Sequence, residues 1–240
     1  MRIAVLSDIH ANIVALEAVL ADAGSVDGVW HLGDVVGYGP EPDAVVDRLR
    51  QIGAIGVRGN HDSAAAGGLE IEAFNPDARA AMEWTRQRIA GSTRRWLADL
   101  PLRRVEGDVT LVHGSPRDPT WEYILSPAIA KDNLADFDTR CCLHGHTHIP
   151  IVFREAGRRM EMIAPSADAT LTLDERRVLV NPGSVGQPRD GIPTASYAVL
   201  DPERGEVSWR RIAYDIEAVQ QQMLKVGLPP ALAARLTFGW

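Results

Sequence analysis

Five short clusters of aspartate, asparagine and histidine, each directly after an apolar run, constrain the fold of this 240-residue chain more than any other feature. They are Asp8-Ile9-His10, Gly33-Asp34, Gly59-Asn60-His61-Asp62, His113-Gly114 and Gly145-His146-Thr147-His148. The runs before them, such as VTLV before His113, have the length of buried strands. Ligands of an open α/β sheet gather beyond the carboxyl ends of its strands, so we expect the clusters to meet at one edge. That arrangement is what a two-metal hydrolytic site needs.

Each cluster is weak evidence when taken alone. An isolated Gly-Asp is more often a turn, and an isolated histidine is more often packed and hydrogen-bonded to backbone. The five clusters together, in compatible order at predicted strand ends, favour a metal site. His31 and His144 stand apart from them, because the first lies within a predicted strand and the second precedes the turn glycine. Both are interpreted as packed histidines.

The predicted elements indicate one continuous α/β domain over residues 1–240. Strands at 2–7, 28–32 and 54–57 alternate with helices that begin after Asn12 and at Glu41, which favours a parallel, right-handed opening. Residues 63–100 are predicted to be mostly helical, with a helix start at Asn75-Pro76, and with the loop 113–125 they could cover the site. After Pro150, closely spaced short strands suggest a second, largely antiparallel sheet. Helices at 216–225 and 230–236 are expected to close the chain.

Composition excludes several classes of protein. A net charge of -7 argues against a protein that grips extended nucleic acid through a basic surface, although a small phosphate ester could still enter a locally cationic pocket. No apolar stretch approaches a membrane span. A cleavable signal peptide would remove the first ligand cluster, so the chain is expected to be cytoplasmic. Adjacent Cys141 and Cys142 are interpreted as reduced core thiols, with a thiol metal ligand as the alternative.

The blocks D-x-H, G-D, G-N-H-[DE], H and G-H-x-H, in this order, resemble those of the calcineurin-like metallophosphoesterase superfamily from residue 1 to about residue 193. The resemblance implies a four-layer α/β/β/α sandwich of two mixed sheets flanked by helices, around two divalent metal ions. One ion would be held by Asp8, His10, Asp34 and His148, and the other by Asp34, Asn60, His113 and His146. His61 would act as the general acid, oriented by Asp62. Manganese is favoured, and iron, zinc or nickel would also suit these ligands.

Two segments bear on the substrate. After Asp34 the chain lacks the arginine of the Asp-Arg-Gly sequence usual in protein Ser/Thr phosphatases. Residues 181–189, NPGSVGQPR, instead resemble a segment of the YfcE-like group of prokaryotic phosphodiesterases. Arg189 and Arg58 are candidate phosphate contacts, with an exposed loop arginine as the alternative. Candidates for stacking on an aromatic or nucleoside leaving group, or for local packing, are Tyr38, Trp121 and Tyr123.

The resemblance therefore implies a metal-dependent phosphoric ester hydrolase. The favoured reading is a phosphodiesterase that cleaves small phosphate esters through a metal-bound hydroxide. A phosphomonoesterase or nucleotide pyrophosphohydrolase, of protein phosphatase or diadenosine tetraphosphatase type, is the alternative. A non-catalytic scaffold is less favoured because His61 and every ligand are present, and a DNA-repair nuclease because extra length and basic surface are missing. A homo-oligomer is left open, with Trp209, Phe238 and Trp240 at an interface or in the core.

Overall fold

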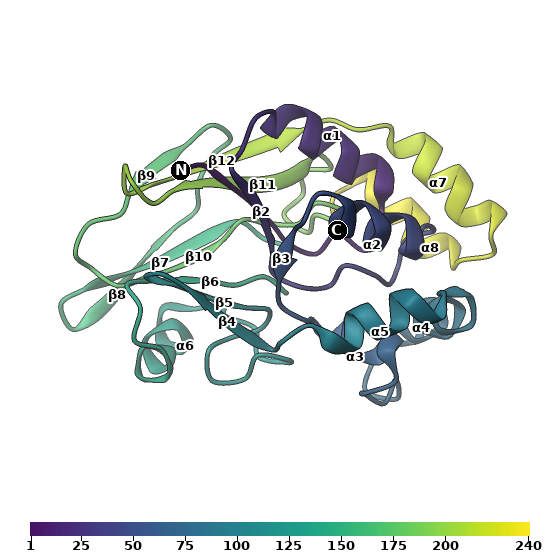
Figure 1. Ribbon diagram of the computed structural model, residues 1–240, viewed down its shortest axis with the longest axis horizontal. Coiled ribbons are helices and arrows are strands. Elements are labelled where there is room, and N and C mark those ends of the chain that lie inside the picture. The colour runs from purple at the N-terminus through teal and green to yellow at the C-terminus, as the bar shows by residue number, and fades with distance from the viewer.

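Two mixed six-stranded sheets lie face to face in the computed structural model, which describes residues 1–240 (Figure 1). The first sheet contains, in spatial order, β3 (Ile55–Gly56), β2 (Gly28–His31), β1 (Ile3–Leu6), β11 (Ala195–Asp201), β12 (Glu206–Ile212) and β9 (Thr170–Thr172). The second contains β4 (Arg103–Glu106), β5 (Val109–Val112), β6 (Cys141–Leu143), β10 (Val178–Asn181), β7 (Ile151–Ala156) and β8 (Arg159–Ile163). Strands β1, β2 and β3 are parallel to one another, as are β5, β6 and β10.

Helices cover the outer faces of both sheets (Figure 1). On the side of the first sheet lie α1 (Ile13–Ala23), α2 (Pro42–Gln51), α7 (Ile216–Lys225), α8 (Pro230–Ala234) and the 3-10 turn η2 (Arg235–Thr237). Helices α3 (Asn60–Ala66), α4 (Pro76–Arg88) and α5 (Gly91–Asp99) lie beyond the strand ends, and α6 (Pro127–Asp132) with the turn η1 (Asn133–Asp136) covers the second sheet. No helix is long and apolar enough to cross a membrane.

The helix starts follow from local sequence. The side chain of Asn12 accepts a hydrogen bond from the Ala15 amide at 3.0 Å, and Asn75 caps α4 in the same way. Each cap satisfies an amide that the first helical turn leaves without a partner. The predicted helix starts after Asn12 and at Asn75-Pro76 are therefore confirmed.

Alternating side chains build three apolar layers. Ile3 and Val5 of β1 pack between the sheets, whereas Ala4 and Leu6 face the helices over the first sheet. On β5, Leu111 joins the layer between the sheets, while Val112 packs towards α6. Because successive strand residues point to opposite faces, strands buried on both sides read as continuous apolar runs. The predicted four-layer sandwich is confirmed.

The strands after Pro150 do not form a sheet of their own, so that part of the prediction is wrong. Strands β9, β11 and β12 extend the first sheet, while β7, β8 and β10 join the second. The spacing of the short runs predicts that strands exist there. It does not predict which strands pair, because pairing depends on residues far apart in the chain. Strand β4 was also not predicted, because its sequence RRVE is polar and largely accessible. Helix α6 was not predicted either, although its sequence contains a helix-start signal: the Ser126 side chain caps it and Pro127 is its first residue.

Both cysteines are buried free thiols. Cys141 packs between the sheets and Cys142 packs towards α6, so their side chains point to opposite faces of β6. Burial raises the pKa of Cys141 to about 12, which keeps this thiol protonated. Neither cysteine belongs to a cluster of metal-ligating side chains, and the alternative of a thiol ligand finds no support.

The layer between the sheets should dominate the stability of the fold. Leu111 is fully buried there, so Leu111→Ala should lower the free energy of unfolding by about 2–5 kcal/mol, through lost burial and a residual cavity. Urea denaturation followed by circular dichroism measures the change. The matched control is Leu224→Ala on α7, where the leucine is 52% exposed and the expected cost is less than about 1 kcal/mol. Equal losses in the two variants would contradict this account.

Candidate metal centre

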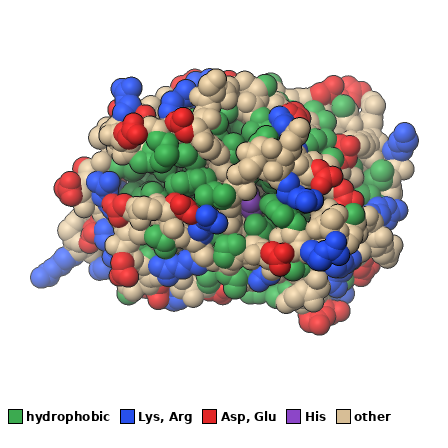
Figure 2. Space-filling view, viewed as in Figure 1, with side chains coloured by type: hydrophobic (Ala, Val, Ile, Leu, Met, Phe, Trp, Pro, Cys, Tyr) green, Lys and Arg blue, Asp and Glu red, His purple; other side chains and the backbone are tan.

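The five clusters meet at one rim, where both sheets contribute strand ends. Asp8 and His10 follow β1, Asp34 follows β2, Asn60 opens α3 after β3, His113 follows β5, and His146 and His148 follow β6. The seven side chains are at most 3% exposed. On the face shown in Figure 2, histidine reaches the surface only as a small patch near the centre, beside hydrophobic and cationic side chains. The predicted convergence at one edge is what the structure shows.

One group of candidate ligands combines Asp8, His10, Asp34 and His148. The Nε2 atom of His148 lies 3.2 Å from Asp8 Oδ1 and 3.2 Å from His10 Nε2. His10 Nε2 lies 3.7 Å from Asp34 Oδ2. The donor atoms of these four residues all lie within 4.8 Å of one another, which is the spacing of ligands around one ion.

A second group combines Asp34, His113 and His146. His113 Nε2 lies 3.3 Å from Asp34 Oδ2 and 3.0 Å from His146 Nδ1. The amide oxygen of Asn60 is 3.1 Å from the same Nε2 atom, so it joins this group. Asp34 belongs to both groups through one oxygen, Oδ2, which lies near His10 and near His113.

The histidine rings are held so that lone pairs face the centre. His10 and His113 place Nδ1 on the carbonyl oxygens of Val36 and Leu32, at 3.1 and 2.8 Å, and His148 places Nδ1 on a third backbone carbonyl. A carbonyl can only accept, so each Nδ1 carries a proton, and each Nε2 can offer a lone pair to the centre when its ring is neutral. Acceptors crowded in this way repel one another unless a cation lies between them.

Buried atoms without partners point to the same conclusion. Asp8 Oδ1 is buried and has no hydrogen-bond donor, although most buried carboxylate oxygens have one. Carboxylate, imidazole and amide donors together suit a divalent transition-metal ion. The residues present therefore fit the metal that the sequence led us to expect.

The backbone at the centre is strained. Positive φ angles occur at five of the candidate ligands, namely Asp8, His10, Asp34, His146 and His148, with values of 48–67°. A non-glycine residue in this region costs on the order of 1–3 kcal/mol and persists only where the surroundings enforce it. The left-handed turns aim side chains two residues apart, such as Asp8 and His10, at one point. No pattern in the sequence predicted this conformation.

Two glycines let backbone approach the carboxylates. A Cβ atom on Gly145 would lie 2.0 Å from Ser7 Oγ and 2.9 Å from Asp8 Oδ2, and one on Gly59 would lie 2.1 Å from Asp34 Oδ1. Asp8 Oδ2 instead accepts hydrogen bonds from the Ser7 hydroxyl at 2.6 Å and from the His146 amide at 3.1 Å. The carboxylates are therefore fixed by the loops that carry the other ligands.

His61 lies at the same rim. Its ring centroid is 4.9 Å from that of His10 and 4.5 Å from that of Tyr38, and its Nδ1 atom has no hydrogen-bond partner. Burial lowers the pKa of His61 to about 4, with the Asp34 carboxylate opposing the shift. The ring is therefore neutral at neutral pH before a ligand binds.

We expected Asp62 to orient the His61 ring, but Asp62 makes no hydrogen bond to that ring. Its carboxylate accepts hydrogen bonds from the backbone amides of Val35, Val36 and Gly59 at 2.8–3.2 Å. Burial and the nearby Asp34 carboxylate raise the pKa of Asp62 to about 7. Asp62 thus ties the turn after β2 to the start of α3, and it affects His61 only through the backbone.

A cavity of about 260 Å³ opens beside these ligands. Its walls include His61 and the predicted substrate-contact residues Tyr38, Trp121 and Arg189, together with Tyr123 and Phe74. Phe74 was not predicted; it precedes the Asn75 cap of α4, and an apolar residue there was its only signal. Arg189 is the one lysine or arginine of the lining. Its guanidinium donates to Gln187 Oε1 at 2.9 Å and lies over the Tyr38 ring.

Arg58 lies outside this cavity, so its predicted contact with phosphate is wrong. Its guanidinium donates to the carbonyl oxygen of Ala98 at 2.7 Å, near the end of α5. The last carbonyls of a helix lack partners within the helix, and an arginine beside the strand end can satisfy one of them. Its position next to Gly59 in the sequence did not show which way the side chain turns.

The family model of the calcineurin-like phosphoesterase superfamily domain matches residues 1–205. The chain is 36% identical over 245 residues to the uncharacterized protein MJ0912 of Methanocaldococcus jannaschii, covering 99% of this chain and 98% of that protein. It is 46% identical to a metallophosphoesterase of Sphaerobacter thermophilus, whose crystal structure matches with a TM-score of 0.93 over 100% of this chain and 99% of that chain. The hypothetical protein PH1004 of Pyrococcus horikoshii OT3 has the same fold, with a TM-score of 0.81 at 22% identity over 100% of this chain and 98% of that chain.

The close approach at Gly145 gives a test of the centre. In Gly145→Ala the added methyl group would overlap Ser7 Oγ and displace Asp8, so manganese affinity should fall about 10–100-fold. Calorimetric titration of chelator-treated protein measures the affinity. The control is Gly91→Ala, where the nearest atom to the new Cβ is a side-chain nitrogen at 3.5 Å and binding should not change. Unaltered affinity in a folded Gly145→Ala protein would refute the assigned role of Asp8.

Proposed function

The chain belongs to the calcineurin-like phosphoesterase superfamily, and from this we propose that it is a metal-dependent phosphodiesterase acting on small phosphate esters. The observation that carries the proposal is the position of one cavity. It joins the candidate metal ligands Asp34, Asn60, His146 and His148 to a single cation, Arg189, and to a wall of aromatic rings. Hydrolysis of a phosphodiester needs three matching features: positive charge beside the phosphorus, one cationic contact for the anionic oxygen, and room for a second ester substituent.

In this proposal two divalent ions bind. One would be held by Asp8, His10, Asp34 and His148, and the other by Asp34, Asn60, His113 and His146. Asp34 Oδ2 lies near both groups, so this carboxylate would help to hold both ions. When bound, such ions would supply positive charge to the phosphoryl oxygens and lower the pKa of a water molecule. Manganese remains our favoured metal, with iron, zinc and nickel as alternatives.

Arg189 is proposed to bind an anionic oxygen of the substrate. Its guanidinium is held beforehand by Gln187 Oε1 and packed over Tyr38, so little rotamer freedom remains to be lost on binding. A planar guanidinium matches two phosphoryl oxygens in one orientation. Arg189 would therefore set the direction in which the ester substituents leave the phosphorus.

His61 is proposed to protonate the leaving oxygen. The ring is only 4% exposed, and it lines the cavity next to the candidate ligands. An anionic phosphoryl group beside the ring favours its protonated form, and the buried ring then gives up this proton readily because burial lowers its pKa to about 4. The free Nδ1 atom leaves the ring without a backbone bond that would compete for this role.

A diester is favoured over a monoester by the charge of the lining. A monoester carries nearly two negative charges at neutral pH, and a nucleoside polyphosphate carries more. Arg189 is the one basic side chain available to them beside the ions, in a protein whose net charge is -7. The lining also carries the aromatic rings of Tyr38, Phe74, Trp121 and Tyr123, which would contact a neutral ester substituent.

Activity on model esters tests this proposal. Protein stripped with a chelator and reloaded with manganese should hydrolyse bis(p-nitrophenyl) phosphate with a kcat/KM at least about tenfold above that for p-nitrophenyl phosphate. The reason is that the diester carries one negative charge fewer and one aromatic ring more than the monoester. The absorbance of p-nitrophenolate gives the rates. Higher efficiency on the monoester would make the protein a phosphomonoesterase, and inactivity on both esters with each of the four metals would favour a scaffold.

The role of His61 predicts a dependence on the leaving group. His61→Ala should keep its metal content but lose about 10²–10⁴-fold in kcat for esters with alkoxide leaving groups, because these need a proton. Esters of p-nitrophenol should lose much less, since p-nitrophenolate leaves as a stable anion. Elemental analysis of the metal and rates on both ester types provide the comparison. Loss of metal in His61→Ala would show that this residue is a ligand instead.

A further inference from the structure

We propose that Phe74, Trp121 and Tyr123 form a rigid subsite for a flat aromatic ring, so that one substituent of the phosphodiester is an aryl group or a nucleobase. This inference rests on the proposed phosphodiesterase function and names its class of substrate. The three residues come from two loops, one between α3 and α4 and one between β5 and α6. All three line the cavity beside the candidate metal centre.

Tyr123 presents an open ring face beside the candidate ligands. Its ring stacks on the His146 imidazole with centroids 3.9 Å apart and an interplanar angle of 15°. One face of the phenol is thus covered, yet the residue remains 41% exposed. Tyr123 also lines the cavity, so its accessible part borders the space beside the candidate ligands.

Phe74 and Trp121 continue the surface towards His61. The ring centroid of Phe74 is 4.9 Å from that of His61 and 5.5 Å from that of Trp121, with steep angles between the planes in both pairs. The aromatic wall therefore extends from His146, a candidate ligand, to His61, the proposed acid. A ring bound against it would sit beside the reacting phosphorus.

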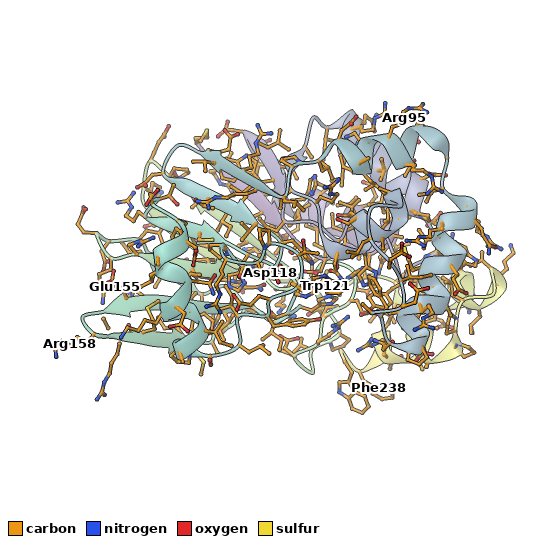
Figure 3. All side chains as sticks on the ribbon, turned by 90° about the horizontal axis from the view of Figure 1, so that it is seen from below. Arg95, Asp118, Trp121, Glu155, Arg158 and Phe238 are labelled. Carbon is orange, nitrogen blue, oxygen red and sulfur yellow. The ribbon has the colours of Figure 1, made fainter.

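The loop that carries Trp121 and Tyr123 is braced from within. Asp118 Oδ1 accepts hydrogen bonds from the amides of Thr120 and Trp121 at 3.0 and 3.1 Å. Figure 3 shows Asp118 and Trp121 near each other in the middle of the molecule. These hydrogen bonds order the backbone at Trp121, so little backbone conformational entropy is lost when a ligand binds against its ring.

Glu122 anchors the same loop from the opposite side. Its carboxylate accepts hydrogen bonds from the Ser115 hydroxyl at 2.6 Å and the Asn133 amide at 2.7 Å, and it pairs with Arg117. The two chain neighbours of Glu122, Trp121 and Tyr123, both line the cavity. Anchoring Glu122 therefore holds in place the short segment that carries both rings.

The charge of the subsite excludes a polyphosphate chain. The cavity lining contains no lysine, and its only arginine is Arg189, which the proposed function already assigns to the reacting phosphoryl group. A second phosphate placed along the aromatic wall would be desolvated without a cation. A neutral flat ring would instead gain stacking and burial of apolar area.

Three diesters with the same p-nitrophenolate leaving group test the subsite. Their second substituent is methyl, phenyl or thymidine. With manganese, kcat/KM for the phenyl and thymidine esters should exceed that for the methyl ester by about tenfold or more, the size of effect that ring stacking supplies. In Trp121→Leu and Tyr123→Leu this ratio should fall towards one, mainly through KM, because leucine keeps apolar bulk but has no flat face.

The matched control is Phe238→Leu. Phe238 is 52% exposed, stacks on Trp240 and projects from the surface in Figure 3, so the ratio should stay at the wild-type value. A higher rate for the thymidine ester than for the phenyl ester would identify a nucleobase as the ligand, and the reverse order an aryl group. Equal rates for all three esters, or an unchanged ratio in both loop variants, would overturn the proposal.

Binding separates this proposal from the function on which it rests. Calorimetry should show phenylphosphonate binding to the manganese-loaded protein about tenfold more tightly than methylphosphonate, with the difference lost in Trp121→Leu. Tighter binding of phenylphosphonate without hydrolysis of any ester would support the subsite and refute the phosphodiesterase. Hydrolysis of the methyl ester at the same efficiency as the esters with a second ring would support the phosphodiesterase and refute the aromatic subsite.

Discussion

Burial of charge at one rim is the constraint on which the rest of the structure depends. Asp8 and Asp34 are almost completely removed from solvent and lie within 3.3 Å of the Nε2 atoms of His148 and His113. A buried carboxylate is costly unless a cation or several donors satisfy it. The fold supplies donors to one oxygen of each carboxylate, from Ser7 and the His146 amide to Asp8 and from the His61 amide to Asp34. The other oxygens, Asp8 Oδ1 and Asp34 Oδ2, belong to the candidate ligand groups, so a bound cation would stabilise the folded rim.

The segment between β10 and β11 shows why the two sheets meet at that rim. The Ser184 hydroxyl donates to the Asp8 carbonyl at 2.8 Å, and the Val185 amide donates to the Ser7 carbonyl at 3.0 Å. At the start of the segment, the Asn181 amide group donates to the Gly145 carbonyl at 2.8 Å. The segment thus ties the ligand loop after β1 in the first sheet to the ligand loop after β6 in the second. Most of the sequence NPGSVGQPR is a brace, and only its last residue, Arg189, reaches the cavity.

This division explains how much the sequence could predict. The ligand clusters and the caps at Asn12 and Asn75 were found because each is local, with an apolar run or helix pattern beside it. The pairing of the late strands was not found, because β10 lies between β6 and β7 through contacts that span dozens of residues. The targets of Asp62 and Arg58 were missed for the same reason. Each side chain bonds to a backbone group far along the chain, Asp62 to the amide of Val35 and Arg58 to the carbonyl of Ala98.

The candidate metal ligands and the aromatic wall of the cavity are held by different means. Five of the candidate ligands have left-handed backbone, and a methyl group at Gly59 or Gly145 would collide with a carboxylate or its partner. The aromatic residues lie on loops and touch the centre only through rings, as Tyr123 touches His146 and Phe74 touches His61. Under the proposed function, substitutions in those loops would change the rings that meet the substrate while the left-handed turns still hold the candidate ligands. The accepted ester would then change while the chemistry at phosphorus stayed the same.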